Sequence, residues 1–147
     1  MLSQSAIYAI RAMSYLAGLE PGRRTLSREI AETLDLPVHF LAKVLGNLSA
    51  EGLLESTRGK TGGFRLKRKP SEITLLDIVD PIDRLSSQDD CLMGNTTCGE
   101  DGGCSLHEGW SGVRENLIDF LKKTTLDTIE QKNGSVQGGS PDAEEKG

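Results

Sequence analysis

Hydrophobic residues recur at intervals of three and four positions along much of the chain, the pattern of helices with one buried face. In the first such segment the stripe comprises Ile7, Ile10, Met13 and Ala17. The predicted helices span residues 5–19, 27–34, 38–50, 74–83 and 105–123, and one more short helix follows Thr125. Thr25 or Ser27 is the expected cap of the second helix, and Thr74 with Asp77 forms a predicted capping box.

Two stretches between the helices predict strands. Residues 53–57 and 64–68 have strand character, and the segment 58–63 between them contains three glycines suited to a turn. The second and third helices are separated only by Asp35-Leu36-Pro37, which is typical of a helix-turn-helix. A helix-turn-helix followed by a β-hairpin is a winged helix. We therefore expect a mostly α fold with a small β-hairpin wing and a long C-terminal dimerisation helix.

The second half of the chain has a different organisation. Residues 84–104 lack periodicity and hold four of the 17 glycines. The helix that follows carries an apolar stripe, which we interpret as a dimer interface: Trp110, Val113, Leu117, Phe120 and Leu121. The expected segments are a winged helix-turn-helix at 1–70, a connecting helix at 71–83, a loop at 84–107, a dimerisation helix at 105–130 and a disordered tail at 131–147.

Charge is distributed unevenly over the 147 residues, whose net charge is −5. Residues 1–70 hold eleven Lys and Arg against six Asp and Glu, whereas residues 71–147 hold six against sixteen. This asymmetry indicates that only the first half faces nucleic acid, although a solvated basic surface gives the same pattern. No apolar run reaches the roughly 18–20 residues of a bilayer span. With no signal-peptide pattern at the start, we expect a cytoplasmic protein with no membrane partner.

The candidate DNA contacts lie on the third helix and on the hairpin. Residues 58–69 contain six basic residues and no acidic one, and Arg58 is the candidate for insertion into a minor groove. Phe40 could instead be a core residue, and the hairpin could simply be solvated. The predicted DNA-binding set is Val38, His39, Phe40, Lys43, Arg58, Lys60, Gly62, Gly63 and Arg65. In this set the two adjacent glycines would leave the backbone bare for close approach.

All three cysteines lie in the aperiodic loop. Cys91, Cys98, Cys104 and His107 have the spacing C-x6-C-x5-C-x2-H. Thiols stay reduced in the cytoplasm, so these residues are better explained as metal ligands than as disulfides. Free surface cysteines and a structural zinc site are the alternatives, although zinc ligands usually come in closer pairs. Iron–sulfur clusters prefer thiolates and can accept histidine.

Several of these segments together resemble the IscR, NsrR and RirA family of iron–sulfur winged-helix regulators, and its IscR branch most. The similarity extends from about residue 1 to 130. The segments that carry it are residues 8–13, residues 40–45 with 51–53, Arg58-Gly59 with residues 62–64, the three-cysteine loop, and residues 120–121 with 124–126. Each segment alone would be a weak signal, but their combination is specific.

The resemblance implies a homodimer that binds imperfect palindromes of double-stranded DNA. It also implies that the three cysteines and His107 hold a cluster, with [2Fe-2S] favoured over [4Fe-4S]. Other branches draw a carboxylate ligand from the first helix, where this chain has Ile7. The first cysteine interval is one residue longer than in IscR, which leaves cluster status, oxygen, nitric oxide and iron as candidate signals. The alternatives are a zinc- or thiol-switched repressor and an electron- or cluster-transfer protein; no catalytic residue set is present.

Overall fold

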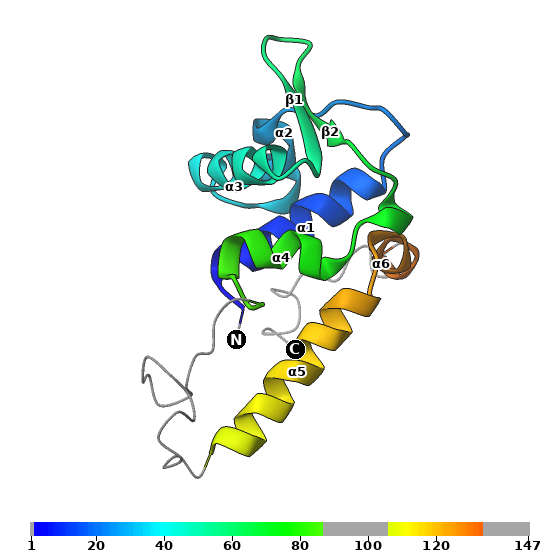
Figure 1. Ribbon diagram of the computed structural model, residues 1–147. Coiled ribbons are helices and arrows are strands. Elements are labelled where there is room, and N and C mark those ends of the chain that lie inside the picture. The colour runs from blue at the N-terminus through cyan, green and yellow to red at the C-terminus, as the bar shows by residue number, and fades with distance from the viewer. Residues whose placement is uncertain (1, 87–105, 134–147) are drawn as a thin grey trace, which may run out of the picture.

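The computed structural model describes residues 2–86 and 106–133 (Figure 1). The elements in chain order are α1 (Gln4–Ala17), α2 (Ser27–Leu34), α3 (Val38–Ala50), β1 (Leu54–Thr57), β2 (Gly63–Leu66), the 3-10 helix η1 (Pro70–Glu72), α4 (Leu75–Asp83), α5 (His107–Lys123) and α6 (Leu126–Asn133). Six α-helices and a two-stranded antiparallel sheet in this part of the chain confirm the mostly α winged-helix architecture.

The helix-turn-helix forms as the sequence predicts. α2 and α3 have the predicted bounds, and Asp35 between them adopts a left-handed conformation at φ 54°. The Leu36 amide then donates to the Ala31 carbonyl at 2.8 Å, while the Leu36 side chain is buried. Pro37 follows as the N-cap of α3, where its fixed φ suits the helix entry. The turn is therefore determined by local backbone chemistry and by one buried leucine.

The helix caps agree with the predictions in part. Thr74 and Asp77 form the predicted capping box at α4. The prediction for α2 was wrong, because its N-cap is Leu26 and no side chain caps it. Thr25 is instead buried and pairs through its backbone with Phe64 of β2, at 3.0 and 2.8 Å. Ser105, where the last long helix was predicted to begin, lies outside the described residues, and α5 begins at His107.

The hairpin projects from the helices as a wing (Figure 1). Its register pairs Leu54 with Leu66 and Glu55 with Arg65, and it ends where Thr57 meets Gly63. Both strands are slightly shorter than predicted, although the Lys67 amide still donates to the Leu53 carbonyl at 3.0 Å. The bridge from Thr25 to Phe64 fastens the segment before α2 to the wing.

The core surrounds α1, which packs against α2, α3, α4 and α6. Its largest fully buried side chains include Met13, Ile30, Leu41, Leu45, Leu48, Leu54, Ile73, Ile78, Leu121 and Leu126. Leu121 is only 2% exposed, so its assignment to the dimer interface is corrected: it packs inside its own protomer. The C-terminal segment is therefore part of the same core as the winged helix.

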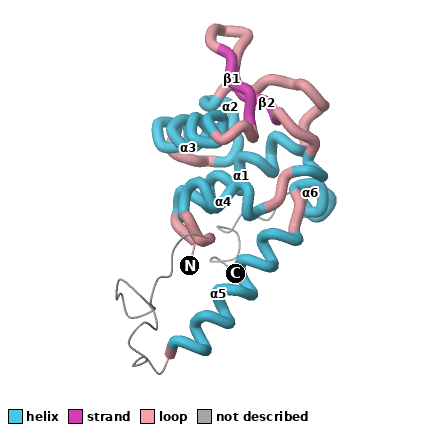
Figure 2. Tube along the Cα trace, viewed as in Figure 1, coloured by secondary structure: helices cyan, strands magenta, loops and turns pink. Residues whose placement is uncertain are grey.

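α5 extends away from this core, and Figure 2 shows it as the long helix that leaves the helical body. Its C-terminal end is held to the core by the buried Leu121 and by the backbone bond from the Leu75 amide to the Thr124 carbonyl at 2.9 Å. α6 includes residues 131–133, where the tail was expected to begin; residues 134–147 lie outside the described part. No helix in residues 2–86 or 106–133 is long and apolar enough to cross a bilayer.

Candidate nucleic-acid interface

The first turn of α3 presents its side chains to solvent. Val38 is 38% exposed and Phe40 39%, and His39 and Lys43 are also exposed. The opposite face of the same helix is buried through Leu41, Val44, Leu45 and Leu48. The amphipathic pattern of α3 therefore places the predicted reading residues on its outer face.

Phe40 is partly packed and partly exposed. Its ring contacts Tyr8 of α1 edge-on, with ring centroids 5.5 Å apart and planes at 90°. Such aromatic pairs contribute about 0.5–1.5 kcal/mol beyond simple burial. This contact fixes one side of the ring, while the rest stays open to solvent. Phe40 is thus held against α1 while remaining part of the exposed α3 surface.

The tip of the wing carries free cations. Arg58 and Lys60 are exposed in the turn between β1 and β2. Within the described residues neither makes an ion pair. An unpaired guanidinium at a projecting tip is available to phosphates or to a minor groove.

Arg65, by contrast, is occupied within the wing. Its Nε and Nη2 atoms donate to Oε2 of Glu55 at 2.9 and 2.7 Å, across the pair that the strand register sets. Arg24 approaches the same carboxylate, with Nη2 3.7 Å from Oε1, and also donates to the Thr57 hydroxyl. Hydrogen bonding and charge from Arg65, followed by the charge of Arg24, lower the pKa of Glu55. The guanidinium of Arg65, a predicted DNA contact, is therefore occupied by Glu55.

Arg24 was missed by the sequence reasoning. It precedes α2 and lies 33 positions before its partner Thr57, so no local pattern points to it. The signal that existed was the doublet Arg23-Arg24 just ahead of the helix-turn-helix. The structure adds Arg24 to the charged residues of the wing, beside Glu55 and Thr57 of β1.

Gly62 and Gly63 have a different role from the one predicted. Both are buried, so they do not offer bare backbone to DNA. A Cβ on Gly62 would lie 2.1 Å from the Thr57 carbonyl oxygen, and one on Gly63 would lie 2.5 Å from that of Thr25. Gly63 also has φ +118°, which L-residues rarely adopt. Gly62 therefore allows the turn of the wing to close on Thr57, and Gly63 allows the wing to lie against the segment before α2.

Of the four candidate metal ligands, the described residues include only the last one in the sequence. His107 is the first residue of α5, whereas Cys91, Cys98 and Cys104 lie outside the described residues. Among residues that are described, no group of three or more His, Cys, Asp or Glu is placed to hold a metal. That finding concerns other parts of the chain and does not test the cysteine loop.

The N-terminal edge of that loop is linked to α1. Asp83, the last residue of α4, accepts from the Ser3 amide at 2.9 Å and from the Ser3 hydroxyl. Ser3 in turn caps α1 by accepting from the Ala6 amide at 3.1 Å. The end of α4 and the start of α1 are therefore held together where the chain enters the loop.

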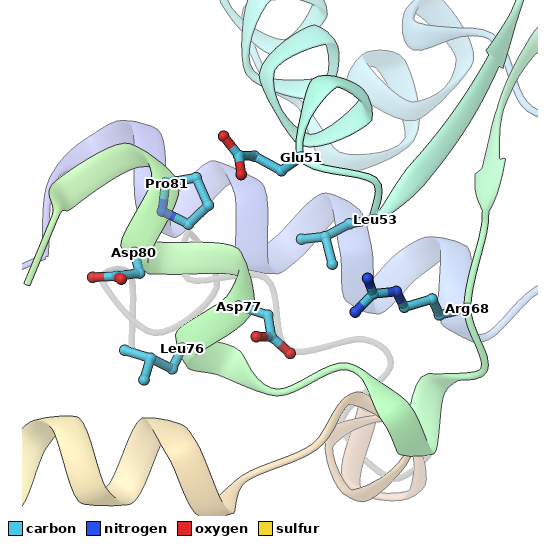
Figure 3. Close-up of a pocket in the computed structure, with 7 residues that line it drawn as sticks. All are labelled: Glu51, Leu53, Arg68, Leu76, Asp77, Asp80 and Pro81. Atoms are coloured by element: carbon cyan, nitrogen blue, oxygen red, sulfur yellow. The ribbon is translucent and has the colours of Figure 1, made fainter. Parts of the chain in front are cut away.

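A cavity of about 390 Å³ lies between α4, the end of α3 and the exit of the wing. Figure 3 shows the Arg68 guanidinium and the Asp77 carboxylate pointing toward one another across it, beside Leu53. Glu51 and Asp80 add two further acids to its lining. The Asp77 and Asp80 carboxylates already accept backbone hydrogen bonds, from Thr74 at 3.0 Å and from Ser86 at 2.8 Å.

Comparison with known proteins agrees with this architecture. The family model described as "Rrf2: Iron-dependent Transcriptional regulator" matches residues 2–132. A protein of Aquifex aeolicus, named as an HTH-type transcriptional regulator, is 35% identical over 138 residues, which cover 90% of this chain and 95% of that protein. The Rhizobium meliloti protein aau3 is 32% identical over 131 residues, covering 87% and 83% respectively.

Two solved structures have a similar fold. CymR, the global cysteine regulator of B. subtilis, superposes with a TM-score of 0.76 at 28% identity, covering 90% of this chain and 97% of that one. IscR of T. potens superposes with a TM-score of 0.71 at 24% identity, covering 95% and 93%. At 24% identity, the similarity to IscR shows a shared fold.

Proposed function

Since this chain belongs to the Rrf2 family of transcriptional regulators, we propose that it binds a palindromic operator as a homodimer under the control of an iron–sulfur cluster. The DNA-binding class rests on the family and on the winged helix. The dimer, the operator symmetry and the cluster are the parts that experiment must test.

The proposed DNA contacts come from the two exposed elements. The first turn of α3 enters the major groove, with His39 and Lys43 near base edges or phosphates. Arg58 at the wing tip enters the adjacent minor groove, and Lys60 meets the backbone. Arg65 acts indirectly in this scheme, since its bond to Glu55 braces the two strands of the wing.

The proposed dimer interface is the outer face of α5. Val113 is 46% exposed and Phe120 58%, while Trp110 and Leu117 are half-buried. Leu117 also packs against the protomer's own core, so Val113 and Phe120 carry most of the free apolar surface. A two-fold axis through this helix would place two reading helices on two half-sites of a palindrome.

The donor set suits a cluster. Three thiols and one imidazole match the four positions of a [2Fe-2S] centre with one histidine ligand, and His107 is the first residue of α5. When bound, the cluster would supply a redox- and oxygen-sensitive centre. This chain's residues would hold it between α4 and α5, beside the Asp83–Ser3 link to α1. Because α1 packs on α3, that link offers a path from the loop to the reading helix.

The first test is anaerobic purification, followed by an absorption spectrum and assays of iron and acid-labile sulfide. We expect a red-brown protein with roughly two irons and two sulfides per chain. Cys98→Ala should abolish the colour and change operator affinity while leaving the winged helix folded. About four irons would overturn the [2Fe-2S] assignment, and one zinc in a colourless protein would favour a zinc-controlled repressor.

A second candidate follows from the similarity to CymR, the global cysteine regulator of B. subtilis. In that case the protein would be free of metal, and operator binding would respond to cysteine availability. Metal-free protein whose operator binding is unaffected by Cys98→Ala would favour this candidate over the cluster.

The DNA-binding surface is tested by comparing Arg58→Ala with Lys122→Ala, since both residues are exposed and Lys122 lies on α5. Binding of each variant to a selected palindrome is measured at two salt concentrations. Arg58→Ala should cost about 1–3 kcal/mol if the side chain reads a groove, whereas Lys122→Ala should change little. Equal effects of the two substitutions would contradict the assignment of the wing.

A further inference from the structure

A second cavity, of about 420 Å³, lies between the end of α1, the loop after it and the segment that leaves the wing. Its volume falls within the range of about 300–1,000 Å³ typical of small-molecule sites. The residues that line it include apolar side chains from two segments distant in sequence: Leu16, Ala17, Leu19 and Pro21 from the first, and Leu66 and Pro70 from the second. Leu16 and Ala17 are buried, and Leu19 and Leu66 pack against the core, so the cavity has a firm apolar floor.

The charged residues around this cavity are mostly basic. Arg23, Lys67, Arg68 and Lys69 line it, against one acid, Glu20. The guanidinium of Arg68 points toward Asp77 in the neighbouring cavity (Figure 3), which leaves Arg23, Lys67 and Lys69. In residues 2–86 and 106–133 none of these three cations makes an ion pair. An apolar floor under unpaired cations is complementary to a ligand that has an apolar body and an anionic group.

The position of the cavity separates it from the proposed reading surface. In Figure 1 the end of α1 and the chain leaving β2 lie on one side of the molecule, and α3 lies on the other. An operator held by the first turn of α3 therefore does not account for these cations. The cavity also adjoins the wing, because Leu66 is the last residue of β2 and Lys67 bonds back to Leu53.

We propose that this cavity binds a small organic anion, a carboxylate with a short apolar body, and that its occupancy changes the affinity of the wing for DNA. The ligand's apolar body lies against Leu16 and Leu66, and its carboxylate meets Arg23 and Lys67. The binding step stands by itself, whereas the effect on DNA rests on the proposed function. A ligand wedged between α1 and the base of the wing alters operator affinity only as far as it favours one wing position.

The binding step is tested on the full-length protein without DNA, with leucine methyl groups labelled for NMR. The probe is 4-phenylbutyrate, and its controls are 4-phenylbutanol, 4-phenylbutylamine and inorganic sulfate. We expect the carboxylate alone to shift the methyl resonances of Leu16, Leu19 and Leu66 in a saturable manner. Equal binding of the alcohol, equal binding of sulfate, or no shift of these methyls at millimolar probe would overturn the proposal.

Variants locate the anionic contact. Lys67→Ala combined with Arg23→Gln should weaken 4-phenylbutyrate binding roughly tenfold or more, since two charge-assisted contacts are lost. Lys122→Ala, which removes a lysine from α5, is the matched control and should leave the affinity unchanged. Equal affinities of the cavity variant and the control would overturn the assignment of these cations.

The regulatory step is tested by measuring operator affinity with and without saturating 4-phenylbutyrate. We expect a change of several-fold in the wild type and none in the double variant. Unchanged operator affinity with the cavity filled would overturn the regulatory part. Failure to bind any operator would instead contradict the proposed function, and the methyl shifts would still report on the cavity.

Discussion

Phe120 has the highest exposed fraction, 58%, of the large exposed hydrophobic side chains in the described part of the chain, and its replacement tests the assembly directly. The proposed dimer covers this side chain on the outer face of α5. Phe120→Ser removes the ring while keeping the helix, because the Thr124 amide and hydroxyl bond only to the Phe120 carbonyl. The substitution should therefore weaken self-association with little effect on the fold of the protomer.

The size of the effect follows from the exposed fraction. Full burial of a phenylalanine stabilises by about 1.5–3 kcal/mol, so covering the exposed part of this ring contributes roughly 1–2 kcal/mol. Two-fold symmetry buries two copies, which gives about 2–4 kcal/mol for the dimer. At about 1.4 kcal/mol per tenfold change, the dissociation constant should rise by roughly 30- to several hundred-fold.

Sedimentation equilibrium over a range of protein concentrations measures this constant. Lys122→Ser is the matched control: it lies on the same helix, is exposed, and introduces the same residue. A dissociation constant for Phe120→Ser equal to that of the control would refute the reasoning that places α5 at a dimer interface. Loss of the helical circular dichroism signal in the variant, at a concentration at which the control is folded, would show that Phe120 serves the core instead.

Two further predictions concern the wing. Glu55→Gln should remove a stabilising contribution that is present above pH 4.5, the ordinary pKa of this group, and is lost as pH falls through the lowered pKa of the folded state. The midpoints of thermal unfolding of the wild type and the variant, measured from about pH 3 to 7, should therefore converge at the acid end. A difference between the midpoints that stays constant over this pH range would contradict this explanation. Gly63→Ala should destabilise the protein by about 2–4 kcal/mol in urea unfolding, through its positive φ and its contact with Thr25. Gly46→Ala, in an open position on α3, is the control and should be neutral or slightly stabilising; equal effects would remove the steric explanation.

Among the candidate site residues, the exposed face of α3 and the wing tip were predictable from sequence. Once α3 is a helix, its buried leucines dictate that Val38, His39 and Lys43 face outward. The tip cations follow from a glycine-rich turn between two short strands. Arg24 was not predictable, because its partners Glu55 and Thr57 lie in a different element and meet it only in the folded wing.

The sequence by itself determined the helix-turn-helix, the wing and the capping box of α4. In each case the information is local: a 3.6-residue apolar period, a turn with a proline, or a threonine three residues before an aspartate. Such local patterns are sufficient to specify helices and turns, because the backbone conformation of each element depends mainly on residues close in sequence. The bounds of α2 and α3 therefore coincide with the prediction.

The tertiary structure alone decided which side chains of these elements remain free. Leu121 and Phe120 are neighbours in one apolar stripe, yet packing of α5 against α4 and the core buries the first and leaves the second exposed. Arg65 and Arg58 are both basic wing residues, yet the strand register pairs only Arg65 with Glu55. Exposure and ion pairing depend on contacts between segments distant in sequence. The order of hydrophobic and charged residues along the chain does not show which of these residues will be buried or paired by such contacts.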